Sequence, residues 1–552
     1  RLNTERSCVS RSLAIGAFLV PFFISIVLCG IPLFVMEVSI GQYLNTGGIG
    51  IWNLVPMFKG VGFASMTMIG LSNIYYIVLI AYTLYYLVAS FRSPLPWEQC
   101  GNEWNTERCL GIRENLSSLA DRNLTAAQAV SSVKEYWEGN VLQITGGLHE
   151  PGDLRMPLAI TLLIAWVLCY FCIWKGVKWT GKVVYFTATF PYVVLLILLI
   201  KGVTLSGAGQ GIAYFLVPDF SKLTDLNIWR RATEQVFYSL AISWGGLIMS
   251  GSYNPFRYAI HIDASIVVVA DLITSLIGGI AIFAVLGHMS LELQVPIEEV
   301  AKAGQGLAFV IYPEALTTFW CPQLWSFIFF FMLYLLGIDS EFPLLQTTLT
   351  VLSDTFPVLR KHRCITALVA CSTCFIIGLS CVTQGGQYVL NLLDTYCAGV
   401  SALFIAMCEV MALMWLYGVR RFSNDVKFML GKRPPWIFRF SWAFLSPLIL
   451  CVLVVYGLVM AAPILYNNVE PYPEWANRVG WFFASLSMIQ IPLWAAVALF
   501  RSRKNIRSAF EPTDTWGPAE KKLLQEYRAT VANAKDRTCN VTLRTVTANG
   551  AA

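Results

Sequence analysis

Charged residues are scarce in this chain. They make up 13% of its 552 residues, whereas soluble domains carry roughly 25%. Histidine is rarer still, with four in total, and the formal net charge of +6 is small for this length. No basic stretch accompanies a nucleic-acid-binding motif, and there is neither a histidine cluster for a metal nor a nucleophile elbow. These shortages exclude a secreted enzyme, a disordered scaffold and a DNA-binding protein, and they give a membrane enzyme little support.

Hydrophobic residues make up 56% of the chain and recur in long uncharged runs. A helix needs ~20 apolar residues to cross the hydrocarbon core of a bilayer. Eleven uncharged runs are apolar enough to hold such a helix: 12–36, 60–91, 156–174, 183–200, 235–256, 272–291, 315–338, 364–393, 395–408, 440–469 and 479–500. The run 395–408 continues past Glu409 to Tyr417. The sequence therefore predicts an all-α integral membrane protein with eleven crossings.

Basic clusters alternate with acidic or neutral loops along the chain. The basic clusters lie at 175–182, 360–363, 420–433 and 501–507. The acidic or neutral loops lie at 91–155, 290–314 and 462–477. Because cytoplasmic loops carry an excess of Lys and Arg, the alternation predicts a cytoplasmic C-terminus. Counted back, the first crossing would leave Arg1, Arg6 and Arg11 outside, so we expect a further helix upstream; residues 1–12 do not resemble a signal peptide.

Most of the fifteen cysteines lie in apolar runs, where a free thiol behaves as a small hydrophobic group. Cys100 and Cys109 lie instead in the polar loop 91–155, close to glycosylation sequons at Asn115 and Asn123. Sequons near a cysteine pair are typical of an oxidising, extracellular loop. A disulfide between the two cysteines would stabilise the fold by roughly 2–3 kcal/mol; two free loop cysteines are the alternative.

Six carboxylates lie within or beside the apolar runs, where a charge costs at least ~2.5–3.5 kcal/mol and is a candidate for function. They are Glu37, Asp271, Asp339, Glu341, Asp394 and Glu409. The Leu336 carbonyl, the Asp339 carboxylate and the Ser340 hydroxyl share one helical turn, and such an oxygen cluster suits a desolvated Na⁺ ion. A neutral carboxyl satisfied by a neighbouring helix is the alternative. Glu37 and Glu409 lie near the predicted helix ends, and we expect structural roles for both.

Glycine and serine interrupt the apolar run 235–256, in the segment SLAISWGG at 239–246. A helix break at membrane depth is tolerated only where it lines a cavity or is buried in protein. Transporters use such breaks to direct helix ends and free carbonyls at substrate and ions. The segment therefore predicts either a binding site of this kind or a packing kink.

Several longer motifs are more specific. They are PLFVMEVSIGQY (32–43), NIYY (73–76), IWKGV (173–177), TGKVVY (180–185), GLAF (306–309), YPEA (312–315), LGIDS (336–340) and TQGG (383–386). Together they resemble the neurotransmitter:sodium symporter family over residues 16–505, most closely the branch that carries GABA, taurine, betaine and creatine. The resemblance implies a LeuT-like inverted-repeat transporter fold, with about eleven of twelve transmembrane helices present. It also implies uptake driven by Na⁺, usually with Cl⁻.

The family's functional positions map onto residues of this chain. The resemblance implies a sodium site at Leu336, Asp339 and Ser340, with Asp271 at a further sodium position. It implies a chloride site at Gln235, Ser239 and Ser275. Substrate would be bordered by Tyr76, Tyr238, Leu240, Ser243 and Trp244. Asp394 resembles the family's outer-gate aspartate, Asp354 resembles its inner-gate aspartate, and Cys100 and Cys109 match its loop disulfide.

The chain departs from the family pattern at four places. Residues 1–15 replace the first helix of the family. We therefore divide the chain into an atypical segment (1–15), a transporter domain (16–505) and a cytoplasmic tail (506–552). Phe22 replaces a chloride-binding tyrosine, Asp271 replaces an asparagine, and Ala241 and Trp244 crowd the helix break. A carboxylate at Asp271 could supply the charge that chloride provides, which predicts weak or absent chloride dependence. A protonated Asp271 acting like asparagine is the alternative.

The resulting hypothesis is a plasma-membrane symporter, not an enzyme. It would carry a small neurotransmitter, amino acid or osmolyte with Na⁺, while its substrate and its use of Cl⁻ are left open. Its partners would be this small molecule and the lipid bilayer, without nucleic acid, and a homo-oligomer is left open. The alternative is a truncated, transport-inactive form that acts by association with a full-length transporter.

Overall fold

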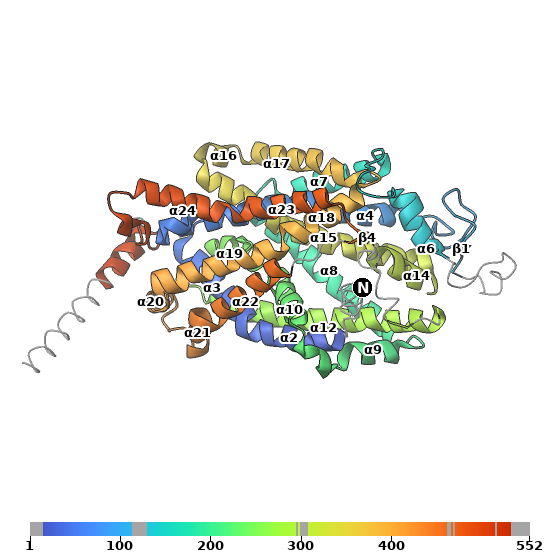
Figure 1. Cartoon of the computed structure of the whole chain (residues 1–552), viewed down its shortest axis with the longest axis horizontal. Coiled ribbons are helices and arrows are strands. Elements are labelled where there is room, and N and C mark those ends of the chain that lie inside the picture. Colours follow the sequence, from blue (N-terminus) through green and yellow to red (C-terminus); the bar gives the residue numbers. More distant parts are fainter. Residues whose placement is uncertain are drawn as a thin grey trace, which may run out of the picture.

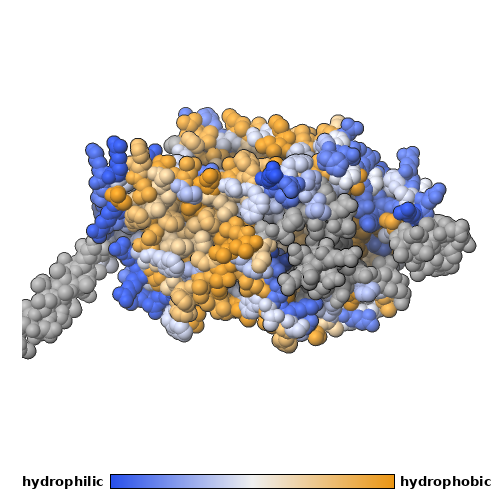
Figure 2. All heavy atoms as spheres, viewed as in Figure 1, coloured by the Kyte–Doolittle hydropathy of each residue, from blue (hydrophilic) through white to orange (hydrophobic). Residues whose placement is uncertain are grey.

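Helices dominate the structure, and most run along the long axis of the molecule (Figure 1). The computed structural model describes residues 15–112, 130–293, 296–297, 307–460, 465–466, 470–513 and 516–530. On the face shown in Figure 2, apolar side chains cover the middle and hydrophilic residues gather at the two ends. An apolar belt between polar ends is what a bilayer requires of a protein that crosses it.

Ten helices or continuous helix chains among the described residues are long and apolar enough to cross a membrane. The first five are α2 (Ile15–Ser25), η1 (Ile26–Gly30) and α3 (Ile31–Leu44); η3 (Pro56–Phe58) and α4 (Lys59–Ala89); α7 (Met156–Ile173); α8 (Val177–Val203); and α12 (Ile260–Leu293). The other five are α15 (Pro322–Thr355); α17 (Arg363–Gly378) and η9 (Leu379–Val382); α18 (Gly386–Cys397), α19 (Gly399–Met411), η10 (Ala412–Gly418) and α20 (Val419–Leu430); α21 (Trp436–Phe440), η11 (Ser441–Leu445) and α22 (Ser446–Val459); and α23 (Glu474–Met488) with α24 (Gln490–Arg501). An interrupted helix, α10 (Leu226–Ser239) and α11 (Gly246–Ser252), occupies most of the predicted run 235–256.

Short elements connect the long helices. The helical ones are η2 (Gly50–Leu54), α6 (Ser132–Glu135), η5 (Tyr136–Leu142), α9 (Ala208–Leu216), η6 (Phe220–Thr224), η8 (Leu307–Ile311), α14 (Tyr312–Thr317), α16 (Pro357–Lys361) and η12 (Ile506–Ala509). Strand β1 (Cys109–Leu110) pairs parallel to β2 (Val130–Ser131), and β3 (Leu465–Tyr466) pairs antiparallel to β4 (Glu470–Pro471). The disulfide between Cys100 and Cys109 is confirmed. The sequons at Asn115 and Asn123 lie outside the described residues.

Helix boundaries differ from the predicted runs wherever a carboxylate is buried. α3 continues through Glu37, and α19 continues through Glu409 into η10, so the placement of these residues near helix ends was wrong. Both side chains are buried in the bundle. α15 likewise passes through Asp339 and extends to Thr355. A charge-free run stops at every carboxylate. The helix itself can continue, because a carboxylate that is shielded by protein can lie in the middle of a helix.

The predicted run 364–393 also needs correction, because it joins parts of two helices. α17 and η9 end at Val382, and α18 begins at Gly386. The turn between them contains only uncharged residues, so no charge marked it. The predicted run 395–408 therefore belongs to the same crossing as α18, and Asp394 lies inside that crossing.

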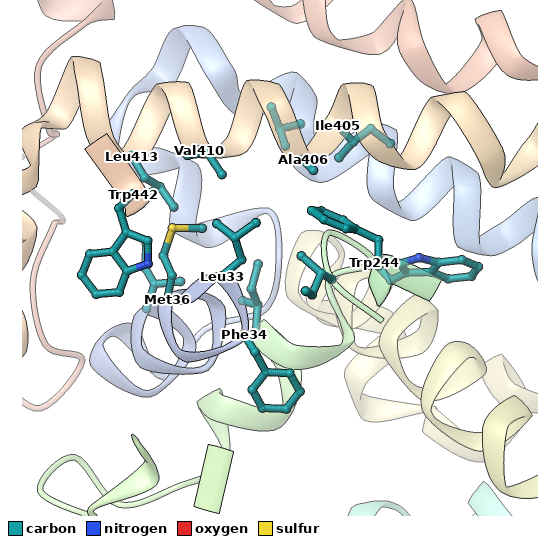
Figure 3. Close-up of a cluster of buried hydrophobic side chains, with 14 of the residues drawn as sticks. Leu33, Phe34, Met36, Trp244, Ile405, Ala406, Val410, Leu413 and Trp442 are labelled. Carbon is teal, nitrogen blue, oxygen red and sulfur yellow. The ribbon is translucent and has the colours of Figure 1, made fainter. Parts of the chain in front are cut away.

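The packing of α3 positions the helix break described below. α4 lies centrally, against α7, α15, α18 and α24, whereas α2 and α3 lie against α10 and α11. Leu33 and Met36 of α3 face Val410 of α19, and Trp442 of η11 lies beside Met36 (Figure 3). These side chains form part of one large apolar core. The core fixes α3, and therefore Glu37, next to the interrupted helix.

Candidate functional site

The interrupted helix breaks at residues 240–245, inside the segment 239–246 that the sequence indicated. Ala241 and Ser243 have left-handed backbone conformations, with φ of 51° and 67°, and Gly245 follows with a φ of 71°. Such a conformation costs a non-glycine residue on the order of 1–3 kcal/mol. The surrounding structure must therefore hold the break in place.

Two helices hold the break through the backbone of Ser243. The Ser243 N–H donates to Glu37 Oε1 of α3 at 2.7 Å, and the Ser65 hydroxyl of α4 donates to the Ser243 carbonyl at 3.0 Å. All three residues are buried. Glu409 of α19 lies close to both Glu37 and Ser243. The sequence did not indicate that Glu37, Ser65 and Glu409 belong to the break, although a carboxylate within an apolar run was an available signal for two of them.

The turn of α15 that contains Asp339 presents three oxygens together. Asp339 Oδ1 accepts a hydrogen bond from the Thr187 hydroxyl of α8 at 2.7 Å, and the Ser340 hydroxyl donates to the Leu336 carbonyl at 3.1 Å. Leu336 is 44% exposed and Ser340 is exposed, so this turn faces an accessible space. Tyr76 of α4 lies beside Ser340. Thr187 is a partner that the sequence analysis missed, because hydroxyl residues are common in apolar helices.

A second carboxylate faces the first half of the broken helix. The Ser239 hydroxyl donates to Asp271 Oδ1 of α12 at 2.6 Å, and Asp271 Oδ2 is buried without a hydrogen-bond partner in the described part of the chain. Ser275 lies one helical turn from Asp271, and Gln235 lies one turn from Ser239. The structure thus brings Ser239 and Asp271 into contact. Gln235 lines a separate open cavity of about 380 Å³.

Aromatic side chains surround the break. Tyr238 and Trp244 meet edge to face with ring centroids 5.5 Å apart, and Tyr238 also lies close to Tyr76. Trp244 is only 5% exposed, and its indole N–H has no partner among the residues described. Leu240 is buried and points toward Gly30 of η1. The structure therefore groups Tyr76 with Tyr238, whereas the side chains of Leu240 and Trp244 are largely enclosed.

The two aspartates expected at gates lie in different surroundings. Asp394 of α18 is near Tyr238. Asp354 is one residue from the end of α15, and its Oδ2 accepts the Gly47 N–H at 2.9 Å. Fifteen residues separate Asp354 from Asp339 on the same helix, which is about 22 Å at 1.5 Å per residue. A cavity of about 530 Å³ lined by α4, α8, α12, α14 and α15 reaches Tyr76 and Leu336.

Comparison with known proteins gives one consistent result. The model of the sodium:neurotransmitter symporter family matches residues 12–502. The chain is 44% identical over 489 residues to the sodium- and chloride-dependent GABA transporter 2 of Rattus norvegicus, covering 88% of this chain and 81% of that one. It is 42% identical over 535 residues to the sodium- and chloride-dependent creatine transporter 1 of Homo sapiens, covering 95% and 84%. It is 44% identical over 500 residues to the sodium- and chloride-dependent taurine transporter of Rattus norvegicus, covering 89% and 80%.

Proposed function

Because this chain belongs to the sodium:neurotransmitter symporter family, we propose that it carries a small amino acid, amine or osmolyte across a membrane together with Na⁺, with a weaker dependence on Cl⁻ than the names of its relatives state. The observation that carries the proposal is the interrupted helix, whose second half packs against α15, the helix that contains Asp339. A break of this kind exposes backbone carbonyls and helix ends in the middle of a membrane, where transporters bind substrate and ions.

We propose that Na⁺, as a co-transported substrate, binds the turn of α15 through the Leu336 carbonyl, Asp339 and Ser340. Support comes from the grouping of these oxygens and from the exposure of the turn. The Thr187 hydroxyl now donates to Asp339, and it can rotate to offer its own lone pairs when a cation arrives. Asp271 would contribute to a further Na⁺ position.

Chloride would bind near Gln235, Ser239 and Ser275. Support comes from the Ser239 hydroxyl, which points at this region and donates to Asp271. Two unit charges 4 Å apart interact by ~4 kcal/mol at an effective dielectric of 20, so the Asp271 carboxylate would weaken the need for a mobile anion. Phe22 offers no hydroxyl donor and stacks on Phe18 with centroids 5.9 Å apart, which fits a reduced role for chloride.

Substrate would lie beside Tyr76, Tyr238 and the backbone of the break from Leu240 through Ser243 to Trp244. The proximity of the two tyrosines supports this placement. Asp394, near Tyr238, would control entry from one side. Asp354 would control exit at the other end of α15.

The family supports a plasma-membrane protein, and the basic loops support a cytoplasmic C-terminus. Labelling of epitope tags at the C-terminus and in the loop 91–155, before and after permeabilisation of cells, tests this orientation. A C-terminal tag that reacts only after permeabilisation supports it. A tag that reacts on intact cells contradicts it.

The transport proposal is tested by uptake of radiolabelled GABA, taurine, betaine, creatine and glycine in cells expressing this chain. Uptake is measured with and without Na⁺ and with gluconate in place of Cl⁻, while surface biotinylation measures delivery. We expect Na⁺-dependent uptake of at least one compound, lost in D339N and retained in D219N, which changes an exposed carboxylate. Efficient surface delivery without Na⁺-dependent uptake of any of the five would contradict the proposal.

A further inference from the structure

The C-terminal segment 516–530 folds back onto one end of the helix bundle (Figure 1). The Trp516 indole donates to the Tyr417 hydroxyl at 3.1 Å, and its ring lies 5.7 Å from that of Tyr43. Just before it, the Thr513 N–H donates to the Asn53 carbonyl at 3.0 Å. The segment is thus part of the folded structure, in contact with η2, α3 and η10.

Tyr527 is the main anchor of the helical stretch at residues 521–530. Its hydroxyl donates to Asp425 Oδ1 of α20 at 3.0 Å, while Asp425 Oδ2 accepts from the Tyr417 hydroxyl. Its ring contacts Tyr43 and Phe428, with centroids 5.9 and 5.6 Å away. Burial, together with the Asp425 carboxylate, raises the pKa of the Tyr527 phenol, so the phenol keeps the proton that it donates.

Much of the rest of this stretch faces away from the bundle. Its side chains are exposed at 521, 522, 525, 526 and 528–530, so the stretch touches the bundle along one side. The ion pair between Arg257 and Glu526 has an N–O distance of 3.5 Å, but its two side chains are 64% and 58% exposed. Such a pair contributes little in water. An element attached along one side, with most of its side chains exposed, opens locally far more often than the core, which makes Tyr527 transiently accessible.

We propose that Tyr527 is a phosphorylation site and that its phosphate releases the segment 516–530 from the bundle. A tyrosine kinase would transfer the γ-phosphoryl group of ATP. The bond between the phenolic oxygen and the γ-phosphorus forms as the bond to the β–γ bridging oxygen breaks, ADP leaves, and the phenol proton passes to a base of the kinase. The proposal rests on the cytoplasmic orientation given above, because kinases and ATP are cytoplasmic.

The physical effect follows from the Asp425 contact. A phosphotyrosine carries ≈ −1.5 to −2 charges near neutral pH. It would replace a donated hydrogen bond with like-charge repulsion against a carboxylate that is only 4% exposed. Tyr43 and Tyr417 are 3% and 4% exposed and belong to membrane-spanning helix chains, so they are shielded from a kinase. Tyr527 is the member of this cluster that lies on a detachable element.

Release of the segment 516–530 would also affect residues 255–258, which follow the interrupted helix. Gln42 donates from Nε2 to the carbonyls of Pro255, Phe256 and Tyr258, just beyond α11. The Phe256 ring packs on Tyr43, with centroids 5.8 Å apart, and Tyr43 in turn contacts Tyr527. Departure of the 516–530 segment would therefore uncover one side of this loop. Loosening of residues 255–258 is the second expected consequence.

Hydrogen exchange of the full-length purified chain in nanodiscs tests the proposal. The protein is treated with a purified tyrosine kinase and ATP, and phosphate at Tyr527 is quantified by mass spectrometry. We expect amide exchange in peptides covering 516–530 to accelerate about tenfold or more on phosphorylation, with a smaller increase in 255–258. Y527F is the matched control and should show no kinase-dependent change. D425N, which keeps an oxygen acceptor but removes the charge, should show a reduced effect.

Two results would overturn the proposal. One is a phosphorylated Tyr527 with exchange of 516–530 unchanged. The other is failure to phosphorylate Tyr527 under conditions in which an isolated peptide of residues 520–530 is modified. If D425N does not fold, the comparison of wild type with Y527F still decides the matter. The readout does not involve uptake, so its failure would leave the transport proposal intact.

Discussion

Two parts of this molecule hold carboxylates within the membrane-spanning bundle, and they give them different partners. At the helix break, Glu37 is 0% exposed and accepts the backbone N–H of Ser243. On α15, Asp339 is partly exposed and accepts from the side-chain hydroxyl of Thr187. Both lie in the middle of long apolar helices, so hydropathy does not distinguish them.

The difference in partner distinguishes a structural carboxylate from one suited to an ion. A backbone N–H can only donate, and it cannot leave Glu37 unless the chain at 240–245 moves. The Thr187 hydroxyl can rotate, and its oxygen can then accept or bind a cation. We therefore expect Glu37 to fix geometry and Asp339 to exchange its partner for Na⁺. This contrast leads to four predictions.

D339N should produce the largest effect of the four variants, on the dependence of uptake on sodium. The substitution keeps the size of the side chain but removes a charge worth up to ~4 kcal/mol at 4 Å and an effective dielectric of 20, before the cost of desolvation. We expect the Na⁺ concentration for half-maximal uptake to rise at least ~tenfold, or uptake to be lost, with little change in the melting temperature. Sodium titration of uptake and thermal unfolding of the purified variant measure the two quantities. An unchanged sodium response would remove Asp339 from the ion site.

E37A should lower the stability of the fold, in contrast to D339N, which should weaken the response to sodium. It leaves the Ser243 N–H buried without an acceptor, which costs about 1–3 kcal/mol, and it also removes packing in the core. We expect a lower melting temperature and reduced surface delivery. E37Q keeps an oxygen acceptor and should recover most of the loss. Equal damage from E37A and E37Q would show that the charge, and not the acceptor, is required.

The sequence predicted the crossings better than their ends, for a physical reason. Apolar length is imposed by the bilayer, so the uncharged runs overlap each of the ten candidate spans and the interrupted helix. Their ends failed at Glu37, where protein shields a carboxylate, and at 383–385, where an uncharged turn separates two helices. Periodicity and charge carry no information about such tertiary shielding.

The candidate site was predictable in part. Asp339, Ser340 and the break at 239–246 were visible because an acidic residue or a glycine pair is rare within an apolar run. Their partners Thr187 and Ser65 were not, since which hydroxyl faces a site depends on how α8 and α4 are packed. The assignments of sodium and chloride positions are predictions that D339N and D271N test, and the assignment of the substrate position stays a prediction.

D271N tests whether the charge of the second partly buried carboxylate, Asp271, substitutes for chloride. Asp271, like Asp339, accepts from a hydroxyl, that of Ser239. Removal of its fixed charge should make transport depend more on chloride, by about tenfold in the uptake ratio between chloride and gluconate, which corresponds to ~1.4 kcal/mol. The chain without this substitution should lose little uptake when gluconate replaces chloride. If gluconate abolishes uptake in both, Asp271 does not substitute for chloride.

S65A should produce the smallest effect and tests the other support of the break. The Ser65 hydroxyl of α4 donates to the Ser243 carbonyl. Loss of this single neutral hydrogen bond should lower the free energy of unfolding by about 0.5–1.5 kcal/mol. T67A is the matched control, because the Thr67 hydroxyl bonds only to Phe63 within the same helix. Thermal unfolding of S65A, E37A and the double variant measures their coupling. Because both residues hold Ser243, the two losses should be non-additive. Additive losses, or an S65A variant no less stable than T67A, would mean that α3 alone fixes the break and that Glu37 accounts for its geometry without help from α4.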